Sequence, residues 1–169
     1  MSIFWVGGPA AAGKTTVSRL FARKYGFLWY SVDAHAFDHE KRAAAAGLHV
    51  LGTGPGDFDR RPMIMEDIQS VRTSVVVEGA FVTPQMAGVA ENAVWLMPSK
   101  EEQRARLQHR NPDTNHEGYI WGWDLIRSQL KDTNATIIPV DGQSIDQTLK
   151  AVEHAFSAIL EPRHIHDTK

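Results

Sequence analysis

The 169-residue chain has no cysteine, no long apolar run and no excess of charge of one sign. Without cysteine it can form no disulfide bond and use no thiolate chemistry. No apolar stretch is long enough to span a bilayer, and the first residues, MSIFWVGG, lack the basic segment and longer apolar run of a secretory signal. The 18 Lys and Arg against 20 Asp and Glu argue against a dominant role on nucleic acid or a membrane surface. We therefore expect a cytoplasmic protein without nucleic-acid or membrane partners.

What the chain does have is an alternation of strand and helix patterns, in a length that suits one domain. Hydrophobic residues make up 43% of it, enough for a buried core. Apolar and β-branched runs predict strands over residues 2–8, 27–33, 74–79, 92–98 and 136–142. Helices are predicted over residues 14–25, 34–46, 60–73, 99–110, 119–132 and 144–160, with a short one after Pro84. This alternation predicts an α/β fold with a parallel sheet covered on both faces.

Acidic residues stand at or near the ends of three predicted strands: Asp33, Glu78 and Asp141. Ligands of open parallel sheets bind beyond the carboxyl ends of the strands. We therefore expect these three carboxylates to lie on the side of the sheet where the first strand leads into a glycine-rich turn.

That turn, GGPAAAGKTT over residues 7–16, contains the pattern G-x-x-x-x-G-K-[ST] between a predicted strand and a predicted helix. Such a loop points successive backbone N–H groups at phosphate oxygens, and the N-terminus of the following helix favours an anion. The residues expected to contact the nucleotide in this way are Gly8, Ala10, Ala11, Ala12 and Gly13. Lys14 is expected to reach the β- and γ-phosphates, Thr15 to ligate Mg²⁺ and Thr16 to bond the α-phosphate.

With this loop the sequence resembles the small P-loop kinases, the group that contains shikimate, gluconate and nucleoside monophosphate kinases. Within the group it looks most like the chloramphenicol phosphotransferase type. The resemblance also rests on SVDAHAFDH after the second strand, VVVEGAF at the third, an arginine-bearing helix near residue 106, and PVDG at the last strand. It implies a three-layer sandwich around a five-stranded parallel sheet, in a single domain over residues 1–169.

The resemblance further implies ATP and Mg²⁺ as cofactors, and transfer of the γ-phosphoryl group to a hydroxyl of a small molecule. Residues 34–73 would form the acceptor-binding segment and residues 104–127 the lid.

Asp33 is the expected catalytic base. A carboxylate near the acceptor hydroxyl can orient it and take its proton during phosphoryl transfer. In the chloramphenicol phosphotransferase type the aspartate of a GVD stretch has this role, and SVD carries it here. The alternative is that Asp33 only caps the next helix.

Glu78 ends an otherwise apolar strand. It is expected to hold Mg²⁺ together with Thr15, through a metal-bound water, or to contact the acceptor. The alternative is a structural bond to the phosphate loop or to Thr15.

Arg106 and Arg110 are four residues apart and share one helix face, where a lid arginine could stabilise the charge of the transferred phosphoryl group. The alternative is a solvated basic face, and Arg127 in the next helix is a weaker candidate. Asp141 and Gly142 lie in the stretch VDGQSID, which resembles the loop that packs on adenine in these kinases. An ordinary strand-to-helix turn is the alternative there.

Two further clusters have a structural explanation that we favour. His35 and His39 have the spacing of zinc ligands on a helix, but no third ligand is evident. We expect them to line the acceptor pocket or a helix surface. Trp121 and Trp123 could close over a ligand, although aromatic residues on such a helix more often serve packing.

The acceptor is expected to be neutral or weakly charged: an antibiotic or other secondary metabolite, a sugar or a nucleoside. The stretch EGAFVTP after the third strand lacks the arginine that nucleoside monophosphate kinases of the adenylate kinase type carry there. The segment 34–66 is expected to form an apolar pocket wall from four residues: Phe37, Phe58, Met63 and Met65.

Two other functions stay open. A nucleoside or nucleotide kinase would be favoured if Arg60 or Arg61 faced the acceptor. A nucleotide-binding switch without phosphoryl transfer would bind ATP, show no acceptor-dependent turnover and pass movement of the loop 111–118 to a partner.

Overall fold

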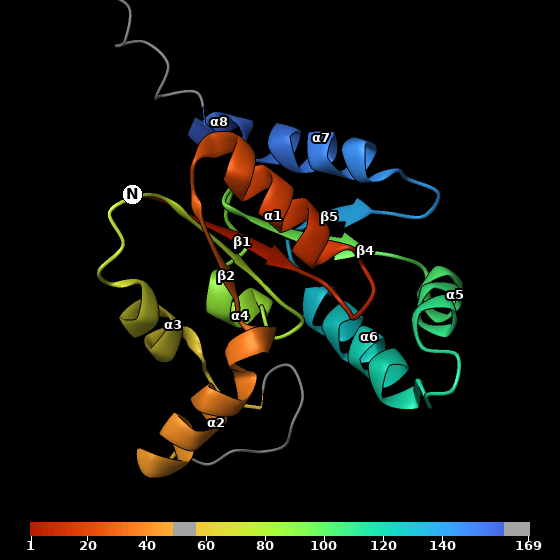
Figure 1. The fold of residues 1–169 in the computed structure, drawn as a ribbon, viewed down its shortest axis with the longest axis horizontal. Coiled ribbons are helices and arrows are strands. Elements are labelled where there is room, and N and C mark those ends of the chain that lie inside the picture. The colour runs from red at the N-terminus through yellow and green to blue at the C-terminus, as the bar shows by residue number, and fades with distance from the viewer. Residues whose placement is uncertain (49–56, 161–169) are drawn as a thin grey trace, which may run out of the picture.

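The fold is built on one sheet of five parallel strands, in the order β2-β3-β1-β4-β5 (Figure 1). The computed structural model describes residues 1–48 and 57–160. The strands are β1 (Ile3–Gly7), β2 (Leu28–Ser31), β3 (Val75–Glu78), β4 (Ala93–Met97) and β5 (Thr136–Pro139). The predicted α/β fold with a five-stranded parallel sheet is confirmed.

The described helices connect the strands as expected from their order. They are α1 (Lys14–Tyr25), α2 (Ala36–Ala45), α3 (Arg61–Ile68), α4 (Pro84–Ala87), α5 (Lys100–Arg110), α6 (Glu117–Leu130), α7 (Ile145–Ala155) and α8 (Ser157–Leu160). A 3₁₀ turn, η1 (Asp33–His35), precedes α2. No helix within the described ranges is long and apolar enough to cross a membrane.

Some predicted boundaries were wrong. The second strand ends at Ser31, so Asp33 lies in η1 beyond the strand. The helix predicted over 60–73 ends at Ile68, and the one predicted over 144–160 is interrupted at Phe156. The ends of helices and strands depend on how far tertiary packing stabilises them, and local propensity does not determine this.

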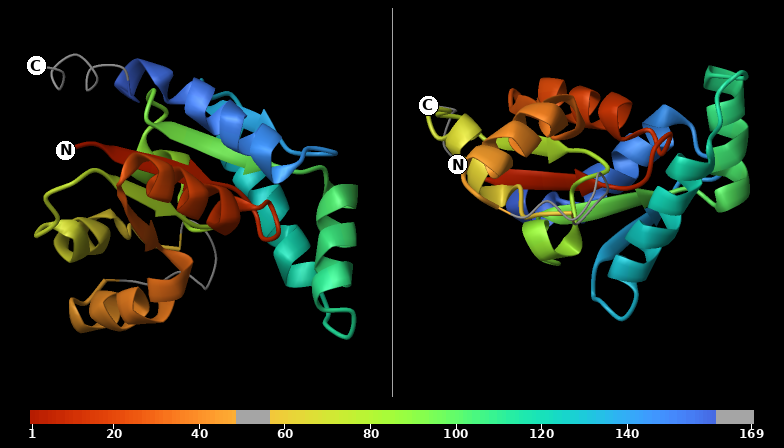
Figure 2. Two further views of the ribbon diagram at one scale, coloured as in Figure 1. Left: turned by 45° about the horizontal axis from the view of Figure 1, so that its top comes forward. Right: turned by 90° about the horizontal axis from the view of Figure 1, so that it is seen from below.

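Both faces of the sheet are apolar because neighbouring strand residues point to opposite sides. Phe4 packs with α1 and α7 on one face, and Trp5 packs with α3, α4 and α6 on the other. The right-hand view of Figure 2 shows α1 and α6 on opposite sides of the sheet. In Figure 1 the strand arrows point toward α5 and α6, so the carboxyl ends of the strands face these two helices.

Candidate functional site

The loop between β1 and α1 has a backbone shape suited to an anion. Gly8, Ala11 and Gly13 all have positive φ, of 135°, 61° and 87°. A side chain at Gly8 could not fit, because its Cβ would lie 2.2 Å from the carbonyl oxygen of Leu96. Helix α1 begins after Gly13 without a side-chain cap and without an acidic residue in its first turn. Its first N–H groups are therefore left without a capping side chain, as a phosphate site requires.

Lys14 is buried, with 5% of its surface exposed, and its Nζ donates to the carbonyl oxygen of Pro9 at 2.8 Å. Burial lowers its pKa, whereas the carboxylates of Asp33 and Glu78 raise it and Arg110 lowers it. The ammonium group thus lies along the loop, within the electrostatic influence of both predicted acidic residues. This is the position from which it can reach a phosphate.

Thr15 and Glu78 are in contact: the Thr15 hydroxyl donates to the Glu78 carboxylate, 3.3 Å from each oxygen. Glu78 is 1% exposed, and burial raises its pKa against the opposing effects of a hydrogen bond from Ser31 and the charge of Lys14. The structural alternative considered for Glu78, a bond to Thr15, is therefore present. The same contact places a hydroxyl and a carboxylate side by side, and both are the oxygen ligands that Mg²⁺ prefers. These residues therefore fit a magnesium ion.

The carboxylate of Asp33 accepts from the backbone N–H of Ala80, at 2.8 and 3.0 Å to its two oxygens, and from that of Phe81 at 3.4 Å. Asp33 does not cap α2, whose N-cap His35 makes no side-chain cap bond. The close approach depends on Gly79, since a Cβ there would lie 2.5 Å from an Asp33 oxygen. The loop after β3 therefore orients the Asp33 carboxylate.

Asp33 lines a cavity of about 480 Å³ that begins at the phosphate loop. Pro9 and Ala10 contribute from that loop, Ala80 and Phe81 from the turn after β3. The remaining described lining residues come from α6 and the residues just before it: Asn115, Gly118, Tyr119, Trp121, Gly122 and Ile126. A molecule in this cavity would touch the phosphate loop, Asp33 and the lid region at once.

Arg106 joins two loops through backbone carbonyls. Its Nη1 donates to Ala11 at 3.3 Å and its Nη2 to Val140 at 2.9 Å, while its Nε donates to Glu102 at 2.7 Å. Arg110 is exposed at the end of α5, near enough to Lys14 to lower its pKa. The two arginines therefore differ: Arg106 supports the phosphate loop from outside, and Arg110 has no hydrogen bond or ion pair to another described residue.

Gln103 is a site residue that the sequence analysis missed. It is completely buried, and its Nε2 donates to the carbonyl oxygen of Ala10 at 3.1 Å and to that of Tyr119 at 3.3 Å. One side chain thus links the phosphate loop to the first turn of α6. Its spacing of three residues from Arg106 puts both on one face of α5, but nothing local distinguishes Gln103 from the exposed Gln108.

No protein-family model and no curated protein matches the sequence. Solved structures do match. A gluconokinase from Sinorhizobium meliloti 1021 superposes with a TM-score of 0.64 at 17% identity, over 99% of this chain and 97% of that one. A shikimate kinase from Bacteroides thetaiotaomicron gives a TM-score of 0.56 at 18% identity, over 92% and 98%. A sugar kinase from Janibacter sp. HTCC2649 gives 0.59 at 16%, over 93% and 95%.

The fold is a small P-loop kinase fold. At these identities the likeness concerns the fold, and it does not single out the chloramphenicol phosphotransferase type that the sequence resembles.

In this P-loop kinase fold the loop after β5 has a structural role for Asp141. Its carboxylate accepts from the backbone N–H of Ser99 at 2.7 Å, and the hydrogen bonding to Ser99 lowers its pKa. The bond joins the β5–α7 turn to the start of α5. Gly142 follows with φ of 65°, and Ser144 begins α7 with a capping box. Adenine binding by this loop stays a prediction, in which backbone groups of the loop would contact the base.

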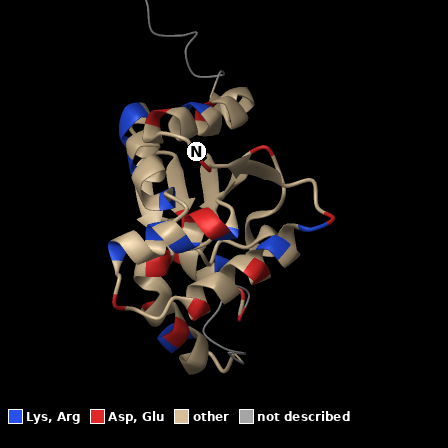
Figure 3. Cartoon of the chain, turned by 90° about the vertical axis from the view of Figure 1, so that its right-hand side faces the viewer, with Lys and Arg blue, Asp and Glu red and all other residues tan. Residues whose placement is uncertain are grey.

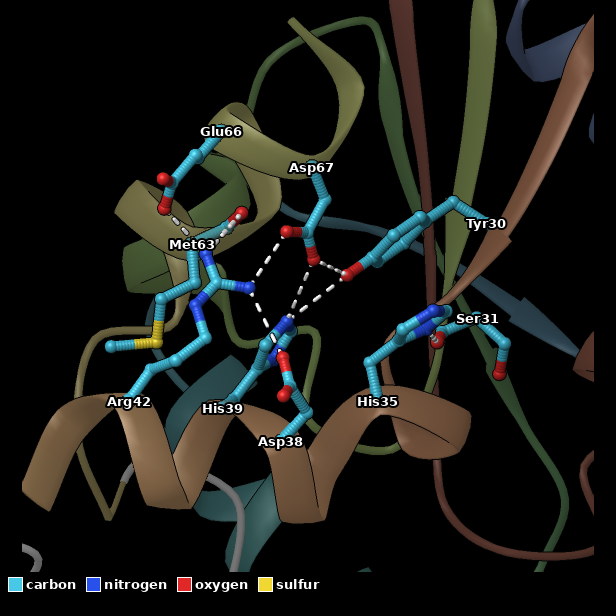
Figure 4. A network of polar contacts seen from close by, with 9 residues as sticks. All are labelled: Tyr30, Ser31, His35, Asp38, His39, Arg42, Met63, Glu66 and Asp67. Atoms are coloured by element: carbon cyan, nitrogen blue, oxygen red, sulfur yellow. Dashed lines mark hydrogen bonds and ion pairs between the residues drawn. The ribbon is translucent and has the colours of Figure 1, made fainter.

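The two histidines belong to a polar cluster between β2, α2 and α3 (Figure 4). His39 is completely buried, with Nε2 3.0 Å from the hydroxyl of Tyr30 and 3.3 Å from Asp67. The ring of His35 stacks on Tyr30 at 4.5 Å. Among the described residues no group of three His, Asp or Glu could hold a metal ion. The histidines pack the segment against the sheet and do not line the cavity described above.

The apolar acceptor wall expected from segment 34–66 stays a prediction, and the residues named for it lie away from the cavity beside the phosphate loop. None of the four lines the cavity: Phe37, Phe58, Met63 and Met65. Phe37 is 69% exposed, and Met63 is a buried residue of α3 itself. Residues 49–56 of the segment lie outside the described residues. The described apolar wall is supplied by α6 and the turn after β3, because the parallel sheet brings those elements to the phosphate loop.

The two tryptophans of α6 have different surroundings. Trp123 is partly buried, and its Nε1 donates to the carbonyl oxygen of Pro98 at 2.7 Å. Trp121 lines the cavity and is 58% exposed. Packing therefore explains Trp123, whereas Trp121 is placed where a ligand could cover it.

Proposed function

We propose that the protein transfers the γ-phosphoryl group of ATP to a hydroxyl of a small molecule. The observation that carries the proposal is the cavity that joins Asp33 to the phosphate loop. A phosphoryl acceptor has to lie between a phosphate-binding loop and a group that receives its proton. The likeness in fold to a gluconokinase, a shikimate kinase and a sugar kinase supports the same class of reaction.

The phosphate loop and Lys14 bind and orient the nucleotide phosphates. MgATP supplies the phosphoryl group, with the metal neutralising part of its charge. Thr15 and Glu78 are the residues that would hold Mg²⁺, through adjacent oxygens. Because Glu78 sits in an apolar strand, its charge has no water to screen it and is best satisfied by a cation.

Asp33 orients the acceptor hydroxyl and takes its proton. Its bonds to Ala80 and Phe81 hold the carboxylate in place and leave lone pairs free, since a carboxylate can accept about four hydrogen bonds. Arg110 is the arginine able to move over the transferred group, because no described side chain holds it. Arg106 contributes indirectly, by supporting the loop that binds the phosphates.

A nucleotide kinase is disfavoured by the partners of two arginines. Arg60 is buried in an ion pair with Asp57, and Arg61 donates to the carbonyl oxygen of Met86 at 2.7 Å. Neither lines the cavity. A non-catalytic switch is disfavoured because it would not require a carboxylate, that of Asp33, beside the phosphate loop.

Asp33→Asn tests the proposal. The amide oxygen of asparagine can still accept from Ala80, so the loop should keep its shape, but the side chain can no longer take a proton. We expect acceptor-dependent ADP release to fall about 100-fold or more, the scale of general-base catalysis, with MgATP binding unchanged. ADP release is measured with MgATP across sugars, nucleosides, nucleotides and hydroxylated antibiotics.

Asp38→Asn is the matched control, because Asp38 is an exposed carboxylate of α2 whose ion pair with Arg42 lies at the surface. It should turn over like the unaltered protein. If MgATP binds and no acceptor stimulates ADP release, the switch replaces the kinase. If Asp33→Asn keeps full turnover, Asp33 is not the base.

A further inference from the structure

The cavity beside Asp33 has one charged side chain among its described lining residues, and that charge is negative. The other described lining residues are apolar, aromatic or small, with Asn115 and the hydroxyl of Tyr119 as the other polar side-chain groups. Figure 3, which looks onto the carboxyl ends of the strands, shows basic and acidic residues mixed over this side of the molecule.

A cation behind the cavity wall, that of Arg60, is already neutralised. The guanidinium of Arg60 lies over the ring of Phe81, 4.2 Å from its centre, and Arg60 is not among the described lining residues. Arg60 is 1% exposed, forms two bonds with Asp57 and lies 3.6 Å from Glu40. An anion in the cavity would therefore meet the ring of Phe81 and the charge of Asp33, and the guanidinium of Arg60 behind that ring is not free to pair with it.

The rest of the wall is mainly aromatic and apolar. Phe81, Tyr119, Trp121 and Ile126 line it, and Trp121 is 58% exposed and Tyr119 45%. Covering aromatic rings that are this exposed is favourable, because it removes apolar surface from water. Another flat apolar surface covers them best, since it can stack on the rings. Gly118 and Gly122 stand one turn apart on the same wall and leave room for such a surface against the helix backbone.

We infer that the acceptor carries no carboxylate or phosphate group and presents a flat apolar ring to Trp121, with its hydroxyl toward Asp33. A neutral molecule satisfies this, as does an amine whose positive charge complements Asp33. The inference rests on the proposed function, because it takes this cavity as the acceptor site. It sets the protein apart from kinases of similar fold that are named for gluconate and shikimate, both of which are hydroxy acids.

A panel of six compounds, in three pairs, separates charge from shape. Methyl mandelate and mandelate share an aromatic ring and a hydroxyl, and only mandelate is an anion. Sorbitol and gluconate are likewise a neutral and an anionic compound with hydroxyls, but neither has a ring. Uridine and uridine monophosphate add a second ring-bearing pair. Binding to the MgADP-saturated protein is measured by calorimetry, and ADP release with MgATP is measured for the same compounds. We expect methyl mandelate and uridine to bind at least tenfold tighter than their anionic partners, and sorbitol to bind more weakly than either.

Trp121→Ala tests the contact itself. It should weaken binding of the neutral ring compounds about tenfold, the scale of a lost aromatic contact. The control is Leu20→Ala, an exposed apolar side chain on α1, which should leave binding unchanged. Trp121 is at the surface, so its loss should not disturb folding, and a melting curve of the variant checks this.

The outcomes separate this inference from the proposed function. Equal or tighter binding of mandelate or uridine monophosphate overturns the inference, as does the absence of binding by both neutral ring compounds. ADP release driven by gluconate also overturns it while supporting the kinase. Binding of the neutral ring compounds that depends on Trp121 supports the inference. If such compounds bind but none of them stimulates ADP release, the result contradicts the proposed function and leaves the inference about binding intact.

Discussion

At the scale of single residues, two side chains of α5 hold the phosphate loop from behind. Gln103 donates to Ala10 and Arg106 to Ala11, so consecutive carbonyl groups of the loop are bonded on the side of α5. A peptide plane whose C=O points toward α5 points its N–H the other way, toward the space where phosphate would bind. The two side chains thereby help to fix the direction of the loop's donors.

Gln103→Leu should weaken this support. The change removes a donor to the carbonyl oxygens of Ala10 and Tyr119, and the loss of each of these part-buried hydrogen bonds costs about 0.5–1.5 kcal/mol of stability. We expect a higher KM for both MgATP and the acceptor, since the loop and α6 lose their common link. Steady-state kinetics and urea unfolding measure the two effects. Gln108→Leu, on the exposed side of the same helix, should change neither, and equal effects of both changes would contradict this role of Gln103.

At the scale of elements, α2 and α3 are joined to β2 by the cluster around Asp67. The Tyr30 hydroxyl donates to Asp67 at 2.5 Å, and Arg42 donates to Asp67 at 2.7 Å and to Glu66 at 2.6 Å (Figure 4). Burial of Asp67 would raise its pKa, but the hydrogen bonds from Tyr30, Arg42 and His39 outweigh this and lower it. The carboxylate of Asp67 therefore stays charged as the pH falls toward 5.

His39 makes the stability of this cluster depend on pH. Burial lowers its pKa below the usual 6.5, although Asp67 opposes this. Because the unfolded chain binds a proton more readily, the stabilisation is complete above about pH 6.5 and is lost as the pH falls through the folded pKa. We expect the free energy of unfolding in urea to decline from pH 7.5 to 5.5. His39→Gln should remove part of that decline, and an unchanged slope would show that His39 is not its source.

At the scale of the whole molecule, the site is assembled from five separate stretches of chain. The loop after β1, the turn η1, the turn after β3, α5 and α6 all meet beyond the carboxyl ends of the strands. A nucleotide bound there bridges several of these stretches in the folded state and has no equivalent site in the unfolded chain. Binding should therefore stabilise the entire fold.

MgATP at about 100 times its Kd should add about 2.7 kcal/mol, or roughly 5–10 °C in Tm for a chain of this length. Lys14→Met should abolish the shift, because Lys14 is the buried cation of the loop. Lys41→Met, an exposed lysine of α2, should keep it. Adding EDTA should reduce the shift if Thr15 and Glu78 hold Mg²⁺. Differential scanning fluorimetry gives all four values, and a full shift in Lys14→Met would contradict the assignment of the loop.

The amino-acid sequence by itself determined the class of fold and the position of the phosphate loop. The strands of a parallel sheet are apolar on both faces, so β1, β3 and β4 stand out as continuous hydrophobic runs. The loop motif depends on backbone conformation, and its glycines and lysine are local in the chain. Asp33 and Glu78 could be picked out because each lies at or just beyond the end of a predicted strand. Their roles stay predictions.

Only the tertiary structure decided which side chains share the site. Gln103 resembles Gln108 in sequence, and Trp121 resembles Trp123, yet in each pair one member faces the site and the other does not. Phe37 and Met63 looked like pocket residues, but Phe37 is exposed to solvent, Met63 is a buried residue of α3, and neither lines the described cavity. Periodicity tells which residues share a face, whereas the packing of one helix against another decides what that face meets. That packing arises from contacts between residues far apart in the chain, so no local pattern encodes it.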